Sequence, residues 1–153
     1  MNEIEYLSNT AKDYDSWVIE NMPDFYNDYL NEKLDQYELF KDNLINSLKY
    51  VNCGTCCSVY RFENYVLKIH TPYDNKINLL CNPTKNNDLG AEESSRNNFL
   101  FYDFISENGY AAVQKFVDCS FNAQNKARSI LGKVNCLANF GMNGDVPLII
   151  DWF

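Results

Sequence analysis

The chain has 153 residues, a length typical of one domain, and 46% of them are hydrophobic, enough for a packed core. Its formal net charge of −8 falls almost entirely on residues 1–50, which hold 11 acidic and 4 basic side chains. This acidity excludes direct nucleic-acid binding through phosphate neutralisation, which needs a basic stripe. The chain has no basic-then-apolar leader and no apolar run of about 18 residues. We therefore expect a cytoplasmic protein that does not cross a membrane.

Residues 1–50 are predicted to form acidic, amphipathic helices. Residues 1–22 indicate a first helix, in which Asp15 or Ser16 caps a turn. From Pro23 to about residue 48, apolar residues recur at helical spacing and predict one long helix. We expect its apolar stripe to pack on the following domain and its acids to face solvent. The alternative is an acidic docking surface for a protein partner, one that mimics nucleic-acid phosphate and is formed by Asp24, Asp28, Glu32 and Asp35.

Residues 51–70 are the stretch richest in functional signals. They indicate a turn of small residues between two strands, and the second strand, Tyr65–His70, carries Lys68 inside an apolar run. Burying an unpaired ammonium group is costly, so this lysine needs an explanation. A bound phosphate, a carboxylate partner, or exposure to solvent on an edge strand would each provide one.

Six cysteines raise the question of metal or redox chemistry. The spacing Cys53-Gly-Thr-Cys56 suits a zinc site or a redox pair, with Cys57, Cys81 and His70 nearby. No second Cys-x-x-Cys follows, and strand-like rather than helix-like sequence comes next, which weakens both interpretations. We favour small residues that fill a tight turn, with all thiols reduced.

The rest of the chain alternates helix and strand signals. Residues 71–90 indicate a loop, Glu92–Glu107 a helix, 110–120 a strand and 122–132 a short helix. Asn143-Gly144 between apolar runs is a strong hairpin signal. The predicted class is α+β, with N-terminal amphipathic helices over residues 1–50 and, over 51–153, a small antiparallel sheet with a packed helix.

The order of these elements over residues 51–153 resembles the protein-kinase-like fold, including its compact bacterial and viral members and the aminoglycoside-phosphotransferase branch. In that family a glycine-rich hairpin covers the ATP phosphates and the next strand supplies a lysine. Leu148-Ile-Ile-Asp-Trp152 is similar to the Ile-Asp-Trp of the phosphotransferase branch. The resemblance implies a Mg-ATP site in which Asp151 binds magnesium and Glu92 is an alternative to Glu93. The implied nucleotide-binding residues are Gly54, Lys68, Glu93, Asn139 and Asp151.

Departures from the family pattern argue against catalysis. Asn52 and Cys57 replace two loop glycines, and Val134 stands where the catalytic aspartate is expected. The chain ends two residues after Asp151, which leaves no sequence for the family's substrate-binding helices. We therefore predict a non-catalytic protein-binding module on a truncated pseudokinase-like core, of viral origin and with no cofactor unless Mg-ATP binds. The alternatives are a small active phosphotransferase, an acidic viral inhibitor of a nucleic-acid enzyme, and a structural component of a particle.

Overall fold

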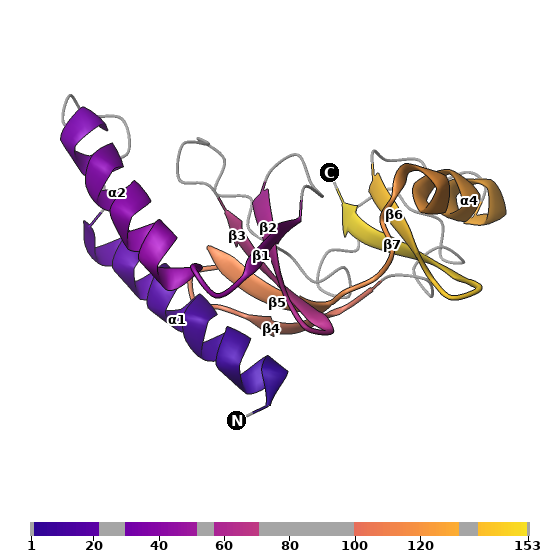
Figure 1. Ribbon diagram of the computed structural model, residues 1–153, viewed down its shortest axis with the longest axis horizontal. Coiled ribbons are helices and arrows are strands. Elements are labelled where there is room, and N and C mark those ends of the chain that lie inside the picture. The colour runs from indigo at the N-terminus through magenta and orange to yellow at the C-terminus, as the bar shows by residue number, and fades with distance from the viewer. Residues whose placement is uncertain (1, 22–29, 52–56, 71–99, 132–137, 153) are drawn as a thin grey trace. The chain divides into compact units, whose positions relative to one another are not determined.

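The computed structural model describes the chain except for residues 1, 22–29, 52–56, 71–99, 132–137 and 153 (Figure 1). It is an α+β protein, which confirms the predicted class. The chain divides into two compact units, Met1–Leu80 with Asp103–Gln114, and Cys81–Tyr102 with Lys115–Phe153. We describe each unit by itself.

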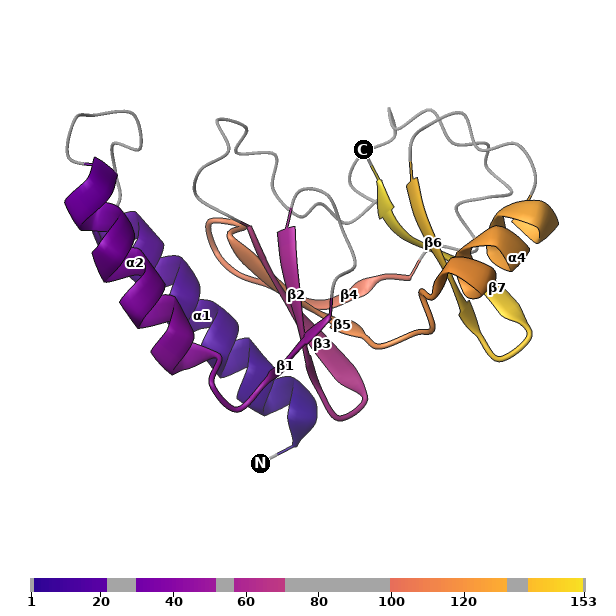
Figure 2. The same ribbon diagram turned by 45° about the horizontal axis from the view of Figure 1, so that its top comes forward.

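Two helices of the first unit lie side by side, α1 (Glu3–Asn21) and α2 (Leu30–Leu44) (Figures 1 and 2). The ring of Trp17 in α1 stacks on Phe40 of α2, with centroids 4.5 Å apart and planes inclined by 6°. Tyr14 packs against both Tyr37 and Phe40. The predicted first helix is confirmed. Of the predicted second helix, residues 30–44 are helical, while 22–29 lie outside the described residues.

The five-stranded sheet of this unit has the order β1-β2-β3-β5-β4. Its strands are β1 (Lys49–Val51), β2 (Cys57–Phe62), β3 (Tyr65–His70), β4 (Tyr102–Ile105) and β5 (Ala111–Lys115). The strand Tyr65–His70 has the predicted bounds. The sequence interpretation missed β2, because the β2–β3 turn at Glu63-Asn64 contains no glycine. Instead, Glu63 itself adopts a positive φ of 53°, which non-glycine residues rarely do.

One core joins the helices to the sheet. Its members are apolar or aromatic residues from α1, the α2 region, β2, β3 and β5. The buried members are Leu7, Ala11, Tyr14, Val18, Tyr37, Ile45, Tyr60, Leu67, Ile69, Ala111 and Val113. The apolar stripe of the N-terminal helices thus packs on the sheet, as expected.

The predicted helix Glu92–Glu107 is wrong at its end, where Tyr102–Ile105 form the strand β4. Tyr102 and Phe104 alternate with Asp103 and Ile105 at the strand period of two, so residues 102 and 104 share one face. A turn at Ser106–Tyr110 then leads into β5, and Gly109 has a φ of 78°. The strand predicted at 110–120 is confirmed over Ala111–Lys115.

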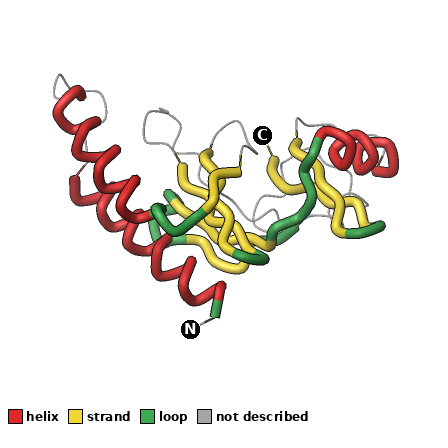
Figure 3. The backbone as a smooth tube through the Cα atoms, in the orientation of Figure 1, coloured by secondary structure: helices red, strands yellow, loops and turns green. Residues whose placement is uncertain are grey.

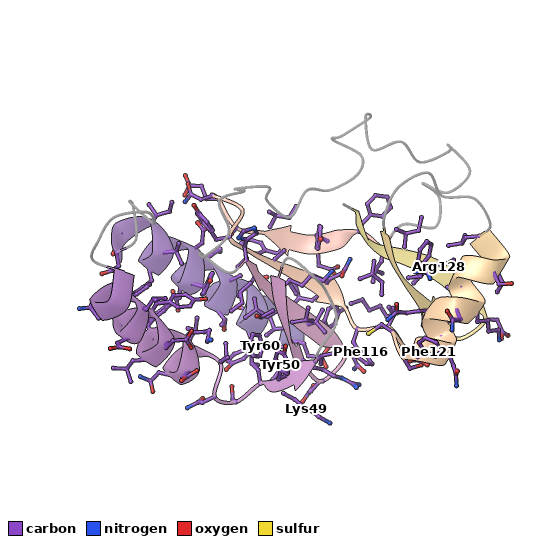
Figure 4. All side chains as sticks on the ribbon, turned by 90° about the horizontal axis from the view of Figure 1, so that it is seen from above. Lys49, Tyr50, Tyr60, Phe116, Phe121 and Arg128 are labelled. Carbon is purple, nitrogen blue, oxygen red and sulfur yellow. The ribbon has the colours of Figure 1, made fainter. Side chains whose placement is uncertain are left out.

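The second unit contains α4 (Phe121–Leu131) and a hairpin of β6 (Ala138–Asn143) and β7 (Val146–Trp152) (Figure 3). The predicted helix at 122–132 and the Asn143-Gly144 hairpin are both confirmed. Small side chains at Ala123 and Ala127 let α4 pack closely on the hairpin core of Phe140, Met142 and Ile149. Phe121 and Arg128 are exposed on α4 (Figure 4), where the Arg128 guanidinium lies 5.1 Å from the Phe140 ring centroid.

Candidate functional site

Lys68 lies in the central strand of the five-stranded sheet and is 1% exposed. Its neighbours Val66, Leu67 and Ile69 are apolar and favour a fully buried strand. The explanation that Lys68 points to solvent from an edge strand is therefore wrong. The edge strands are β1 and β4. On β1, Lys49 and Tyr50 are exposed and Tyr50 packs against Tyr60 of β2 (Figure 4).

The two faces of this sheet have different chemistry. In the β2–β3 register Tyr60 pairs with Leu67, and both belong to the core shared with α1. Val59 pairs with Lys68, and Cys57 with His70, so these residues lie on the opposite face. On β5 the core residues Ala111 and Val113 alternate with Ala112 and Gln114. We call the opposite face the lysine face; its residues with described side chains include Val59, Val66, Lys68, His70, Ala112 and Gln114.

The lysine face is buried although it carries polar groups. Gln114 is 0% and His70 is 2% exposed, comparable to Lys68. In the part of the chain that the structure describes, Nδ1 of His70 is buried without a hydrogen-bond partner. Leaving such a nitrogen unpaired costs ~1–3 kcal/mol. Buried polar groups need partners, which a ligand or other side chains of the chain can supply, and Lys68 and Gln114 both take part in interactions within the chain.

Hydrogen bonds to its backbone fix the position of His70. The amide of His70 donates to the Tyr110 carbonyl oxygen at 2.8 Å, and the Tyr14 hydroxyl donates to the His70 carbonyl oxygen at 2.7 Å. The imidazole contacts the Tyr110 ring edge-on, with centroids 6.3 Å apart. The end of β3 is therefore held by Tyr14 of α1 and by Tyr110, the residue before β5.

Asp15 organises the turn that leads into β5. Its carboxylate accepts hydrogen bonds from Ser106 Oγ at 2.7 Å, Asn108 Nδ2 at 2.8 Å, Tyr110 N at 3.0 Å and Asn108 N at 3.1 Å. Burial and then the nearby Asp15 charge raise the pKa of Tyr110. Asp15 is thus buried in the middle of α1 and does not cap a turn as predicted. Because Tyr110 also holds His70, Asp15 supports the lysine face indirectly.

Asn139 and Asp151 occupy opposite positions on the β6–β7 hairpin of the second unit. They are register partners, with a bulge between Asn139 and Phe140. The backbone therefore brings together the two residues that the resemblance assigns to magnesium and nucleotide, although their side chains lie outside the described ones. Gly54 and Glu93 also lie outside the described residues.

The predicted partner-binding acids lie on α2 or before it. Asp35 is exposed on α2, whereas Asp24, Asp28 and the side chain of Glu32 lie outside the described residues. Sequence reasoning missed Leu39, which is 67% exposed on the same helix face, four residues after Asp35 and three before the exposed Asp42. A leucine out of phase with the apolar stripe was the signal that could have identified it.

Cys119, between β5 and α4, is disulfide-bonded, so the expectation that all thiols are reduced is wrong at this residue. Among the described residues, no three potential metal ligands form a group. Across the same residues, no helix is long and apolar enough to cross a membrane. Comparisons with protein-family models, curated proteins and solved structures find no match to this chain.

Proposed function

We propose that the chain is a non-catalytic protein-binding module on a reduced pseudokinase-like core, and that the outward face of α2 binds the partner. The observation that carries this proposal is Leu39, exposed between Asp35 and Asp42. An apolar side chain flanked by acids suits a basic partner surface with an apolar contact at its centre.

The packing of α2 supports the same proposal. Tyr37 is fully buried and Phe40 stacks on Trp17, so the inner face of the helix is fixed in the core. Because its inner face is fixed, the helix loses little conformational entropy when a partner binds its outward face. Lys41 pairs with Glu38 at 2.7 Å, and this pair leaves Asp35 and Asp42 as the acids beside Leu39.

Two features support the kinase-like part of the proposal. In kinases the glycine-rich loop precedes a lysine on the third strand. Here residues 52–56 connect β1 and β2, and Lys68 lies in β3. The register pairing of Asn139 with Asp151 agrees with a metal aspartate that follows a catalytic-loop asparagine across a hairpin. Val134 supports the absence of catalysis, because a hydrocarbon side chain cannot accept a proton from a substrate hydroxyl.

The test compares two variants as affinity baits in an extract of cells that express the protein. The first variant, D35N/L39S/D42N, removes the charge and the apolar contact on α2. The control, D13N/E20Q, neutralises two exposed acids of α1. Quantitative mass spectrometry should find a basic protein that the wild type and the control retain and the α2 variant loses. If no captured protein distinguishes the α2 variant from the control, the proposal is wrong.

A second candidate function, Mg-ATP binding, rests on the buried lysine face around Lys68. Calorimetric titration of Mg-ATP should give saturable heat in the wild type and none in Lys68→Met, which removes the ammonium group and keeps the length of the side chain. The control is Lys49→Met on the exposed edge strand, which should bind like the wild type. Absence of heat in the wild type would exclude this function.

A further inference from the structure

The exposed side of α4 carries a pattern that matches the outward face of α2 with the opposite charge. On α2, Asp35 precedes Leu39 by four residues, and both side chains are exposed. On α4, Lys126 precedes Ile130 by four residues; Lys126 is exposed and Ile130 is 54% exposed. Residues four apart lie on one side of a helix, about 6 Å apart along its axis. Each helix therefore offers one charged and one apolar side chain at the same spacing.

The two helices also differ in charge as a whole. The helix α4 contains Lys126 and Arg128 and no acidic residue, whereas α2 contains four acidic and two basic residues. The second unit holds six acidic and six basic side chains, so the net charge of −8 belongs entirely to the first unit. In the part of the chain that the structure describes, neither Asp35 nor Lys126 forms an ion pair. Both charges are therefore available to another molecule.

We propose that a second copy of the chain binds the outward face of α2 with its α4. When the two helices lie parallel and Leu39 contacts Ile130 of the other copy, Asp35 faces Lys126, because each charge lies one turn towards the N-terminus of its helix. The contact between the apolar side chains removes hydrophobic surface from water. The ion pair fixes the orientation and the register of the two helices.

Charge complementarity selects a second copy as the occupant of this face. Both surfaces are present on every molecule, so each copy can offer its α4 to the α2 of the next. Such a contact joins two different surfaces and is therefore heterologous, which allows rings or longer chains of molecules as well as pairs. The proposal goes beyond the proposed function and does not depend on it. A basic partner and a second copy would compete for the same face of α2.

Sedimentation velocity of the purified full chain at increasing concentration tests the proposal. A contact this small predicts weak association, with a dissociation constant of about 10 µM to 1 mM. The mean mass of the wild type should rise with concentration and fall again at high salt, because salt screens an exposed ion pair. K126Q/I130S should weaken association at least tenfold. The control, K115Q/V146S, removes one exposed cation and one exposed apolar side chain of the same unit and should associate like the wild type.

Charge reversal distinguishes a lost contact from a misfolded variant. D35K and K126E each place like charges opposite one another and should each weaken association at least tenfold. The double variant D35K/K126E restores opposite charges and should associate at least tenfold more tightly than either single variant. The proposal is overturned if the wild type stays monomeric at about 1 mM, if K126Q/I130S associates like the wild type, or if the double variant does not recover. None of these results decides the proposed function, because K126Q/I130S keeps the α2 face intact and should still retain a basic partner from the extract.

Discussion

Tyr14 donates its one hydroxyl proton to the carbonyl oxygen of His70, at 2.7 Å. The 2.8 Å contact between the Tyr14 and Tyr37 hydroxyls must therefore use the Tyr37 proton. A directed chain thus runs from Tyr37 in α2 through Tyr14 in α1 to the end of β3. These hydrogen bonds connect α2, whose outward face is proposed to bind a partner, with β3, which carries Lys68.

The first prediction concerns the hydrogen bonds that join Tyr37, Tyr14 and His70. Tyr14→Phe removes one donor and one acceptor and leaves the buried Tyr37 hydroxyl and His70 carbonyl without these bonds. We expect the free energy of unfolding to fall by ~1–3 kcal/mol, measured by urea denaturation. Tyr50→Phe on the exposed edge strand is the control and should change stability by less than ~0.5 kcal/mol. Equal effects of the two substitutions would contradict the assigned chain.

Asp15→Asn should be strongly destabilising. The amide keeps one acceptor oxygen and places a donor against the donors of Ser106, Asn108 and Tyr110. Since hydrogen bonds to a charged group contribute more than neutral ones, we expect a loss of ~2–4 kcal/mol in the same assay. The neighbouring Asp13→Asn is a matched control, because Asp13 is exposed, and it should leave stability nearly unchanged.

Lys68→Met distinguishes a ligand-binding lysine from a structural ion pair. If Lys68 serves a ligand, an apolar side chain of similar length should change stability by less than ~1.5 kcal/mol or increase it. If Lys68 neutralises a buried acid, the same substitution leaves that acid unpaired and costs ~3–5 kcal/mol. Because Lys68 takes part in an interaction within the chain, we expect a loss of stability, measured by urea denaturation without nucleotide. A change of less than ~1.5 kcal/mol would show that the fold does not need the Lys68 ammonium group.

Gly141→Ala should destabilise the hairpin unit. A Cβ there would lie 2.7 Å from Cδ1 of Ile150 and 2.8 Å from the Asp118 carbonyl oxygen, which as backbone cannot easily move. We expect a loss of ~1–3 kcal/mol. Gly144→Asn in the β6–β7 turn is the comparison. Gly144 has a φ of 61° and open space around it, and asparagine tolerates that conformation, so thermal unfolding should change little.

Asp118 should give α4 a measurable sensitivity to acid. Hydrogen bonds from Ser120, including one from its amide at 3.0 Å, lower the pKa of the Asp118 carboxyl. A lowered pKa means that the folded state favours the ionised group. The resulting stability is complete above the ordinary carboxyl pKa and is lost as pH falls through the lowered value. Asp118→Asn should therefore lose less stability between pH 7 and about pH 2 than the wild type does. Parallel losses would contradict this assignment.

Local patterns in the sequence were sufficient to predict several elements. The apolar run Tyr65–His70, the Asn143-Gly144 turn and the period of α4 each carry their signal within a few residues. The strand β2 was missed because Glu63 makes the turn that follows it without glycine. The end of the predicted helix at Glu107 was wrong because pairing with β5 decides the conformation of residues 102–105, and such pairing leaves no local signal.

The candidate site could be predicted only where its signal is local in the sequence. Lys68 stood out because a charge interrupts an apolar run. The role of Asp15 was missed, although its place between Ala11 and Val18 sets it beside the buried stripe of α1, because its hydrogen-bonding partners lie more than 90 residues away in the sequence. His70 was noted only as a nearby ligand, since its pairing with Cys57 depends on the register of two strands.

Trp17, which stacks on Phe40, also supplies a fluorescence signal from the first unit. The chain has two tryptophans, and they fall in different units, Trp17 on α1 and Trp152 on β7. Each unit therefore carries one tryptophan. Replacing either tryptophan with phenylalanine leaves an emission signal from a single unit, so the cooperativity between the two units can be measured directly as the difference between two melting curves.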